Sequence, residues 1–231
     1  MGQRDITGKL SADGAIWGAP YRWGSTVIAY QSKKLDELDL KIEDWQDLWQ
    51  PELRDRISLL DSPREIIGLT LKKLGYSYNL DDLESVTNLE SELQELNQQA
   101  KLYSSDRYLE PLILGDTWAA VAWSTDIIPL AQRYPEIKFV VPASGSAFWA
   151  DMWVQPKISD NPDLINDPKI DAKFIEEWIN FCWQPKAAKQ ISLFTNGISP
   201  ILSSWETREI PQNLQDNPLL RQYNHLSLIH I

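Results

Sequence analysis

The sequence has few of the residues that build metal sites and covalent cross-links. Cys182 is the single cysteine, so neither an intramolecular disulfide nor a cysteine-cluster zinc site can form. The two histidines, His225 and His230, both lie within the last seven residues. A histidine base or metal ligand would have to come from that extreme end of the chain. We therefore expect no metal and no cofactor.

The motifs of the common enzyme classes are also missing. The chain contains no GxSxG, GxGxxG, GxxxxGK[ST], HExxH or CxxC sequence. This argues against hydrolases with a nucleophile elbow, nucleotide-dependent enzymes and zinc proteases of the usual kinds. A mechanism that uses only carboxylates stays open, because glycosidases need just a pair of acids.

Long apolar segments are absent as well. No run reaches the roughly 20 apolar residues of a membrane helix, and residues 1–18 lack the apolar centre of an export signal. The formal net charge is -11, which would repel the phosphates of a nucleic acid. An acidic surface suits a cationic ligand, although it can also serve solubility alone. We predict a soluble chain that binds no nucleic acid.

What the sequence does contain is an alternation of short strands and amphipathic helices. Apolar or alternating patterns predict strands over residues 25–30, 57–60, 117–123, 137–141 and 148–154. Helical spacing predicts helices over 44–49, 62–75, 83–96, 109–114, 127–134, 172–183 and 185–194, with weaker helical pieces after Pro211. The apolar last six residues, 226–231, have no helix cap and are left out of the fold. Such alternation predicts an α/β protein with a largely parallel sheet.

The turn after the strand at 57–60 carries both a helix-start signal and a candidate ligand group. Ser62 suits the N-cap, Pro63 the first helical position, and Glu65 completes a capping box. In open α/β sheets, ligands bind beyond the carboxyl ends of strands, where this turn should lie. Glu65 can therefore serve the helix, a ligand or both.

Aromatic residues are abundant, with 11 Trp and 8 Tyr against 5 Phe. Most of them should simply pack in or near the core. In the predicted strand FWADMWV, however, alternation puts Trp149, Asp151 and Trp153 on one face. A carboxylate flanked by indoles could hold an ammonium group through charge pairing and cation–π contact. The alternative is an exposed face on which Asp151 is solvated.

Five segments together resemble, in order and spacing, parts of the bacterial spermidine/putrescine-binding receptors. They span roughly residues 19–200 and read PYRWGSTVIAY, WQDLWQPELRDRISLLDSPREIIGLTLKKLGYSYN, LILGDTWAAVAWSTD, VVPASGSAFWADMWVQPK and FIEEWINFCWQPKAAKQISLFTNGISP. That family has the two-lobed periplasmic binding-protein fold of type II, whose lobes close around the ligand. The resemblance implies a receptor, and not an enzyme.

The resemblance also implies a set of ligand-binding residues. Trp123 and Trp149 match the aromatic walls of the polyamine site, and Asp151 matches a carboxylate that holds a ligand amine. Glu65 matches a second carboxylate, and Ser105 matches a position that lines the same pocket.

Two positions depart from the family pattern. Ser62 stands where the family offers a further ligand-facing acid, and Ser144 stands where an acid is usual in the loop before Phe148. Fewer carboxylates compensate a desolvated diamine less well. A receptor of the same fold for another solute, such as a sugar, therefore stays open. A hydrolase that uses Glu65 and Asp151 is the more distant alternative.

The resemblance further implies how the chain is organised. Residues 1–26 correspond to the end of the first lobe and the hinge entry, and 27–149 to a nearly complete second lobe. Residues 150–200 correspond to the return to the first, partial lobe, and 201–231 to a C-terminal helical segment. We expect an N-terminally truncated piece of a periplasmic protein. The whole protein is expected to be a monomer that delivers a polyamine to an ABC transporter permease in the membrane.

Overall fold

A computed structural model describes residues 18–154 and 172–201. The chain divides into two compact units. One is the continuous segment Gly24–Trp149, and the other combines the described residues 18–23, 150–154 and 172–201. Each unit is described separately below.

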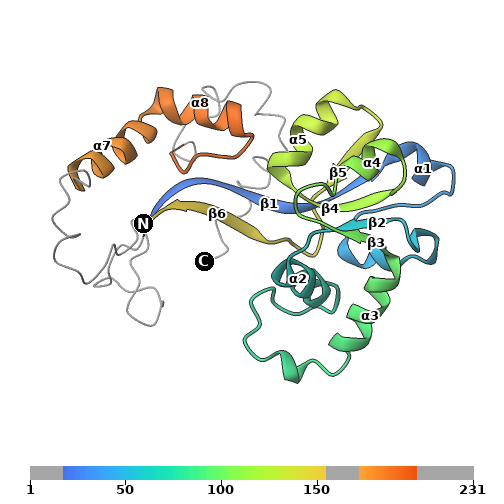
Figure 1. The fold of residues 1–231 in the computed structure, drawn as a ribbon. Coiled ribbons are helices and arrows are strands. Elements are labelled where there is room, and N and C mark those ends of the chain that lie inside the picture. Colours follow the sequence, from blue (N-terminus) through green and yellow to red (C-terminus); the bar gives the residue numbers. More distant parts are fainter. Residues whose placement is uncertain (1–17, 155–171, 202–231) are drawn as a thin grey trace. The chain divides into compact units, whose positions relative to one another are not determined.

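A single mixed sheet forms the framework (Figure 1). Its strands are β1 (Ala19–Gln31), β2 (Ile57–Leu59), β3 (Ala100–Tyr103), β4 (Ala119–Trp123), β5 (Ile137–Val140) and β6 (Phe148–Trp153). The strand order is β3-β2-β4-β1-β5, and β6 also pairs with β1. β2 runs parallel to β3 and β4, whereas β1 runs antiparallel to β4 and β5. The predicted α/β class is confirmed, but the sheet is mixed because β1 enters it antiparallel.

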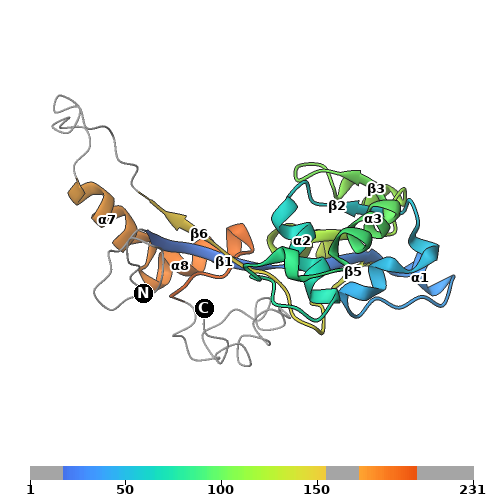
Figure 2. The same cartoon turned by 90° about the horizontal axis from the view of Figure 1, so that it is seen from below.

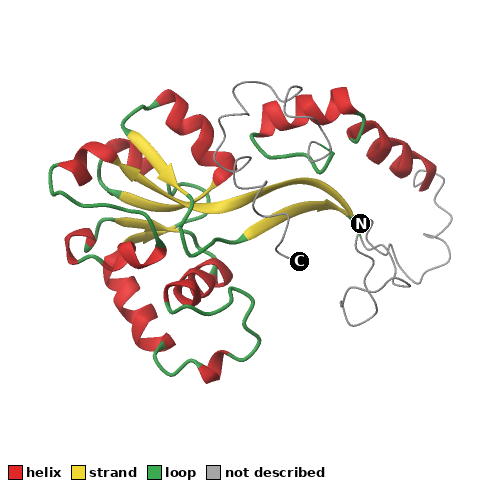
Figure 3. Cartoon of the chain, turned by 180° about the vertical axis from the view of Figure 1, so that it is seen from behind, coloured by secondary structure: helices red, strands yellow, loops and turns green. Residues whose placement is uncertain are grey.

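Helices connect the parallel strands of the Gly24–Trp149 unit. They are α1 (Ser32–Asp36), α2 (Pro63–Lys73), α3 (Leu89–Gln99), α4 (Glu110–Leu114) and α5 (Ser124–Arg133), with 3₁₀ turns η1 (Trp45–Trp49), η2 (Pro51–Leu53) and η3 (Leu83–Ser85). α2 and α3 connect β2 to β3, and α5 connects β4 to β5 in the opposite direction along the sheet. Right-handed crossovers of opposite direction place these helices on opposite sides of the sheet, as Figures 1 and 3 show.

The core of this unit lies where the central strands are covered on both sides. Val27, Ile28 and Ala29 of β1 are completely buried, as are all residues from Ala119 to Ala122 in β4. Strands buried on both faces read as continuous apolar runs and not as alternating ones. This fits the apolar run that predicted β1, whereas β4, predicted from an alternating pattern, is buried on both faces as well.

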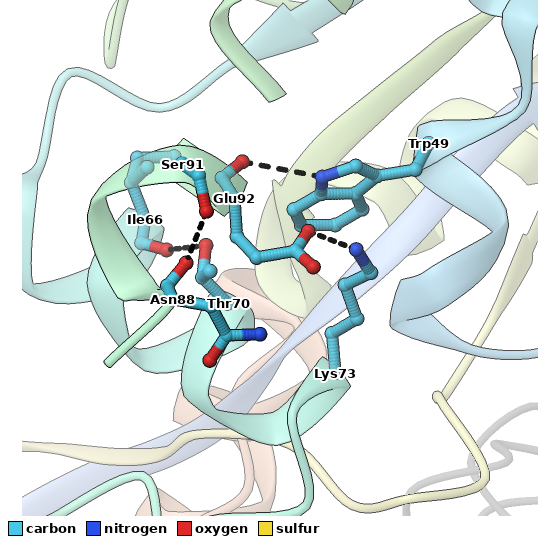
Figure 4. A network of polar contacts seen from close by, with 7 residues as sticks. All are labelled: Trp49, Ile66, Thr70, Lys73, Asn88, Ser91 and Glu92. Atoms are coloured by element: carbon cyan, nitrogen blue, oxygen red, sulfur yellow. Dashed lines mark hydrogen bonds and ion pairs between the residues drawn. The ribbon is translucent and has the colours of Figure 1, made fainter. Parts of the chain in front are cut away.

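A polar network fastens the C-terminal half of α2 to α3 and η1 (Figure 4). The Lys73 ammonium forms an ion pair with the Glu92 carboxylate, and both side chains are 17% exposed. Lys73 Nζ also lies 4.3 Å from the centre of the Trp49 ring, whose indole N–H donates to the Glu92 carbonyl oxygen at 3.2 Å. These contacts hold the C-terminal half of α2 in place, and Glu65 lies at the opposite, N-terminal end of the same helix.

The second unit contains α7 (Ala172–Cys182) and α8 (Pro185–Thr195), which follow each other directly (Figure 2). Trp23 and Ile198 exchange two backbone hydrogen bonds of 2.9 Å, and the Trp183 indole N–H donates to the Pro20 carbonyl oxygen at 2.9 Å. The Trp153 ring lies 4.6 Å from the Tyr21 ring. The Trp153 ring also lies 6.1 Å from the Trp178 ring, so aromatic packing joins the start of β1, the end of β6 and α7.

The structure differs from the predicted elements in a few places. β3 was missed because its sequence, AKLY, is short and lies at the sheet edge with Lys101 and Tyr103 exposed. The helix predicted over 83–96 begins only at Leu89, after the separate turn η3. The helical pieces predicted after Pro211 and the last six residues lie outside the described part of the chain.

Candidate functional site

The sheet topology marks one position at which a ligand site is expected. From β2 the chain moves outward to β3, whereas from β4 it moves the other way to β5, although β2 and β4 are neighbours. The carboxyl ends of β2 and β4 therefore flank a topological switch point, where α/β sheets open a crevice. Glu65 follows β2 in the first turn of α2, and Trp123 is the last residue of β4.

Glu65 does not cap its own helix. The Ser62 side chain makes no capping hydrogen bond, so the predicted capping box is wrong. Instead, Glu65 Oε2 accepts hydrogen bonds from the Tyr78 hydroxyl at 2.7 Å and from Thr26 Oγ1 at 2.9 Å. These two O–H donors draw the carboxylate away from the helix backbone and towards β1.

Trp123 lies beside the same part of β1. It is the register partner of Thr26 in the antiparallel β1–β4 pair, so the two side chains project from one face of the sheet. Its ring packs edge-on against Tyr108, with ring centres 6.0 Å apart. Its backbone N–H donates to the Tyr108 hydroxyl at 3.3 Å, and that hydroxyl donates to Asp126 Oδ2 at 2.6 Å.

Trp149 packs where β1 enters this unit. A Cβ atom on Gly24 would lie 2.3 Å from Trp149 Cζ2 and 2.7 Å from Ser124 Oγ, so a residue with a side chain does not fit there. Ser124 Oγ accepts a hydrogen bond from the Ser25 backbone N–H at 3.1 Å. The Trp149 indole N–H is buried and has no acceptor among the described residues.

The structure thus brings three of the predicted site residues to one short stretch of β1. Gly24 contacts Trp149, while Thr26 binds Glu65 and pairs with Trp123. Residues two apart on a strand share a face. A carboxylate and two indoles therefore gather around the stretch Gly24–Thr26.

Ser62 and Ser105 lie at the same carboxyl edge of the sheet. Ser62 follows β2, and Ser105 follows β3, which runs parallel to β2. Both are half-buried. Within residues 18–154 and 172–201, no hydrogen bond joins either side chain to Glu65 or Trp123.

Asp151 belongs to the other unit and already has a cationic partner. Its Oδ2 accepts a hydrogen bond from Arg22 Nε at 2.7 Å, and the two side chains are 48% and 28% exposed. Gly197 lies beneath the Arg22 stem, since a Cβ there would be 3.0 Å from Arg22 Cδ. A cation of the chain itself, the Arg22 guanidinium, thus already pairs with Asp151.

Arg22, Thr26 and Tyr78 bind the two acids but were not predicted from the sequence. Arg22 meets Asp151 because β1 and β6 pair, and Tyr78 meets Glu65 because the chain turns back after α2. The sequence offered a clue for Tyr78 alone. Tyr78 follows Gly75, the predicted end of the helix, by three residues, where the chain can turn back.

In the ranges that the structure describes, no group of three His, Cys, Asp or Glu side chains could hold a metal ion. None of the helices in these ranges is long and apolar enough to cross a membrane. Both histidines lie outside them.

Known proteins resemble this chain over most of its length. A spermidine/putrescine-binding periplasmic protein of Salmonella typhimurium is 28% identical over 176 residues, which cover 76% of this chain and 47% of that protein. A putrescine/cadaverine-binding protein of Pseudomonas aeruginosa is 28% identical over 173 residues, covering 69% and 49%. The chain spans about half the length of these relatives.

Solved structures show the same fold. The spermidine/putrescine transporter substrate-binding protein PotD of Streptococcus pneumoniae is 27% identical with a TM-score of 0.70, covering 87% of this chain and 58% of that one. A Listeria monocytogenes structure at 24% identity, with a TM-score of 0.73, supports the fold alone. The expected periplasmic binding-protein fold is therefore confirmed. Because residues 4–223 also match the family described as bacterial extracellular solute-binding protein, the chain belongs to that family.

Proposed function

We propose that this chain is part of a receptor that captures a polyamine and delivers it to an ABC transporter for import. The observation that carries this proposal is the gathering of Glu65, Trp123 and Trp149 around β1 at the topological switch point. The relatives named as polyamine-binding proteins support the choice of ligand.

The chemistry of these groups suits a flexible cation. A carboxylate pairs with an ammonium group, and an indole face attracts the same charge through cation–π contact. The methylene segments between the amines can lie against the aromatic rings. We assign Glu65, Trp123 and Trp149 to the ligand, with Ser62, Ser105 and Asp151 as further contacts.

The receptor's setting follows from the same relatives. We place the whole protein in the periplasm, as a monomer that docks on a membrane permease, because several relatives are named periplasmic. We assign it no catalytic activity and no nucleic-acid partner. Family members are solute-binding proteins, which agrees with both assignments.

Indole N–H signals in a proton–nitrogen NMR spectrum can test the proposal even when binding is weak. The chain has 11 tryptophans, so Trp123→Phe and Trp149→Phe variants would first assign the two relevant signals. Putrescine and spermidine should shift both signals in a saturable manner. Trp45, which is completely buried in the core, provides a signal that should not move.

A sugar panel and a chromogenic glycoside serve as the opposing arms of this experiment. Saturable shifts with a sugar and none with polyamines would replace the proposed ligand class. Turnover of a glycoside that is lost in Glu65→Gln would replace the receptor with a hydrolase.

A further inference from the structure

Glu65 has a second possible hydrogen-bonding arrangement that the structure does not use. At the third position of α2, its carboxylate could turn back to the Ser62 backbone N–H, as in a capping box. The observed side chain instead points to Tyr78 and Thr26. Contacts outside the helix therefore determine which of the two arrangements Glu65 adopts.

Tyr78 lies where it can determine the arrangement of Glu65. Gly75 ends the turn after α2 with φ +81°, a conformation that favours glycine, and the chain then returns along the helix. Gly68, one turn after Glu65, has no side chain, and the Tyr78 ring fills that space: a Cβ there would lie 2.2 Å from Tyr78 Cζ. The ring thus lies flat against α2 with its hydroxyl at Glu65.

Both donors act on the same carboxylate oxygen. Tyr78 OH and Thr26 Oγ1 donate to Oε2, and among the described residues no other side chain donates to this carboxylate. Burial, together with the nearby Glu65 carboxylate, raises the pKa of the Tyr78 phenol well above its ordinary value, so the hydroxyl keeps its proton at neutral pH. Thr26 is 1% exposed and lies on the central strand β1.

We propose that Tyr78 and Thr26 are positioning residues that hold Glu65 towards the ligand, with Oε1 left to receive an ammonium group. This inference rests on the proposed function and adds residues to it. A loop tyrosine then sets the affinity for the amine without touching it. Gly68, which leaves room for the Tyr78 ring, and Gly75, where the chain reverses, then contribute to binding indirectly.

Affinity measurements on the 231-residue chain test this inference. Tyr78→Phe removes only the hydroxyl and should weaken spermidine binding by about tenfold, because Glu65 can then turn back to the helix start. Thr26→Val should also weaken spermidine binding, whereas Thr26→Ser, which keeps the hydroxyl, should retain the parent affinity. Tyr76→Phe is the matched control, because Tyr76 lies in the same loop and is 40% exposed.

A double-mutant cycle separates positioning from a general structural effect. In a Glu65→Gln background, Tyr78→Phe should cause no further loss of spermidine affinity. An equal loss in both backgrounds, or no loss in the parent, would overturn the inference.

The same double-mutant cycle can be measured by unfolding in urea, which needs no ligand. If the parent chain shows no polyamine response at all, the proposed function fails. The Tyr78–Glu65 link is then judged by stability alone: non-additive costs of Tyr78→Phe and Glu65→Gln would support it, and additive costs would overturn it.

Discussion

Asp151 on β6 is bound by Arg22 on β1, with Oδ2 and Nε 2.7 Å apart. The pair is partly exposed, so each charge keeps some contact with water. An amine that binds Asp151 must share it with, or displace, the guanidinium. Arg22 should therefore lower the receptor's affinity for cations.

Arg22→Met should raise polyamine affinity by up to about fivefold, because a partly exposed ion pair contributes at most about 1 kcal/mol. The NMR titration described above measures the change. Lys189→Met, on an exposed part of α8, removes the same charge elsewhere and should have no effect. A fall in affinity on Arg22→Met would mean that the arginine orients Asp151 for the ligand.

Asp151→Asn should weaken amine binding roughly ten- to a hundredfold, because it removes the charge from a charge-assisted hydrogen bond. The matched change Glu177→Gln, on an exposed part of α7, should leave binding as it is. An unchanged dissociation constant for Asp151→Asn would remove Asp151 from the site.

Lys73→Met should lower the free energy of unfolding by about 1–3 kcal/mol, because it leaves the half-buried Glu92 carboxylate without its cation. Arg107→Met breaks an ion pair whose side chains are 76% and 57% exposed. That change should cost clearly less than Lys73→Met, because water screens the exposed charges. Urea unfolding measures both, and equal costs would contradict the role given to the Lys73–Glu92 network.

Gly68→Ala should destabilise the protein by about 1–3 kcal/mol, since the new methyl group collides with the Tyr78 ring. Elsewhere inside a helix the same change stabilises by about 0.5–1 kcal/mol. In a Tyr78→Ala background, the effect of Gly68→Ala should therefore change sign. Stabilisation by Gly68→Ala in the parent chain would show that the ring is not packed there.

Alkaline pH should destabilise the protein in part through Tyr108. Burial, with the hydrogen bond to Asp126, raises the pKa of this phenol in the folded state. The stabilising contribution is complete below the unfolded pKa of about 10 and is lost as pH rises above it, because the unfolded chain releases the proton first.

Urea unfolding between pH 8 and pH 11 measures this loss. Above about pH 10 the free energy of unfolding of the parent should fall more steeply than that of Tyr108→Phe, by up to about 1.4 kcal/mol per pH unit. Parallel stability curves for the two proteins would contradict the prediction.

The sequence predicted those parts of the site that depend on local patterns. A β-branched apolar run identified β1, an alternating pattern identified β4, and the strand-to-helix turn before Glu65 identified the carboxyl edge of the sheet. Trp123 and Glu65 could therefore be expected near each other. The family resemblance supplied the ligand class, which patterns alone did not give.

The partners of the two acids could not be predicted. The Arg22–Asp151 pair depends on the pairing of strands 129 positions apart in the chain, and single-sequence patterns do not set that register. The Tyr78–Glu65 bond depends on how a loop returns along its helix. The capping box was mispredicted because two tertiary O–H donors outcompete the local backbone contact.

The contact between Gly24 and Trp149 joins the first and last residues of the continuous segment Gly24–Trp149. That segment is an insertion in the chain of the other unit, which continues at Trp23 and Ala150 as the paired strands β1 and β6. A segment whose two ends meet can fold as a compact unit of its own. Trp149, a proposed wall of the ligand site, therefore also holds the two ends of this segment together, so a substitution there should alter both ligand contact and the stability of the segment.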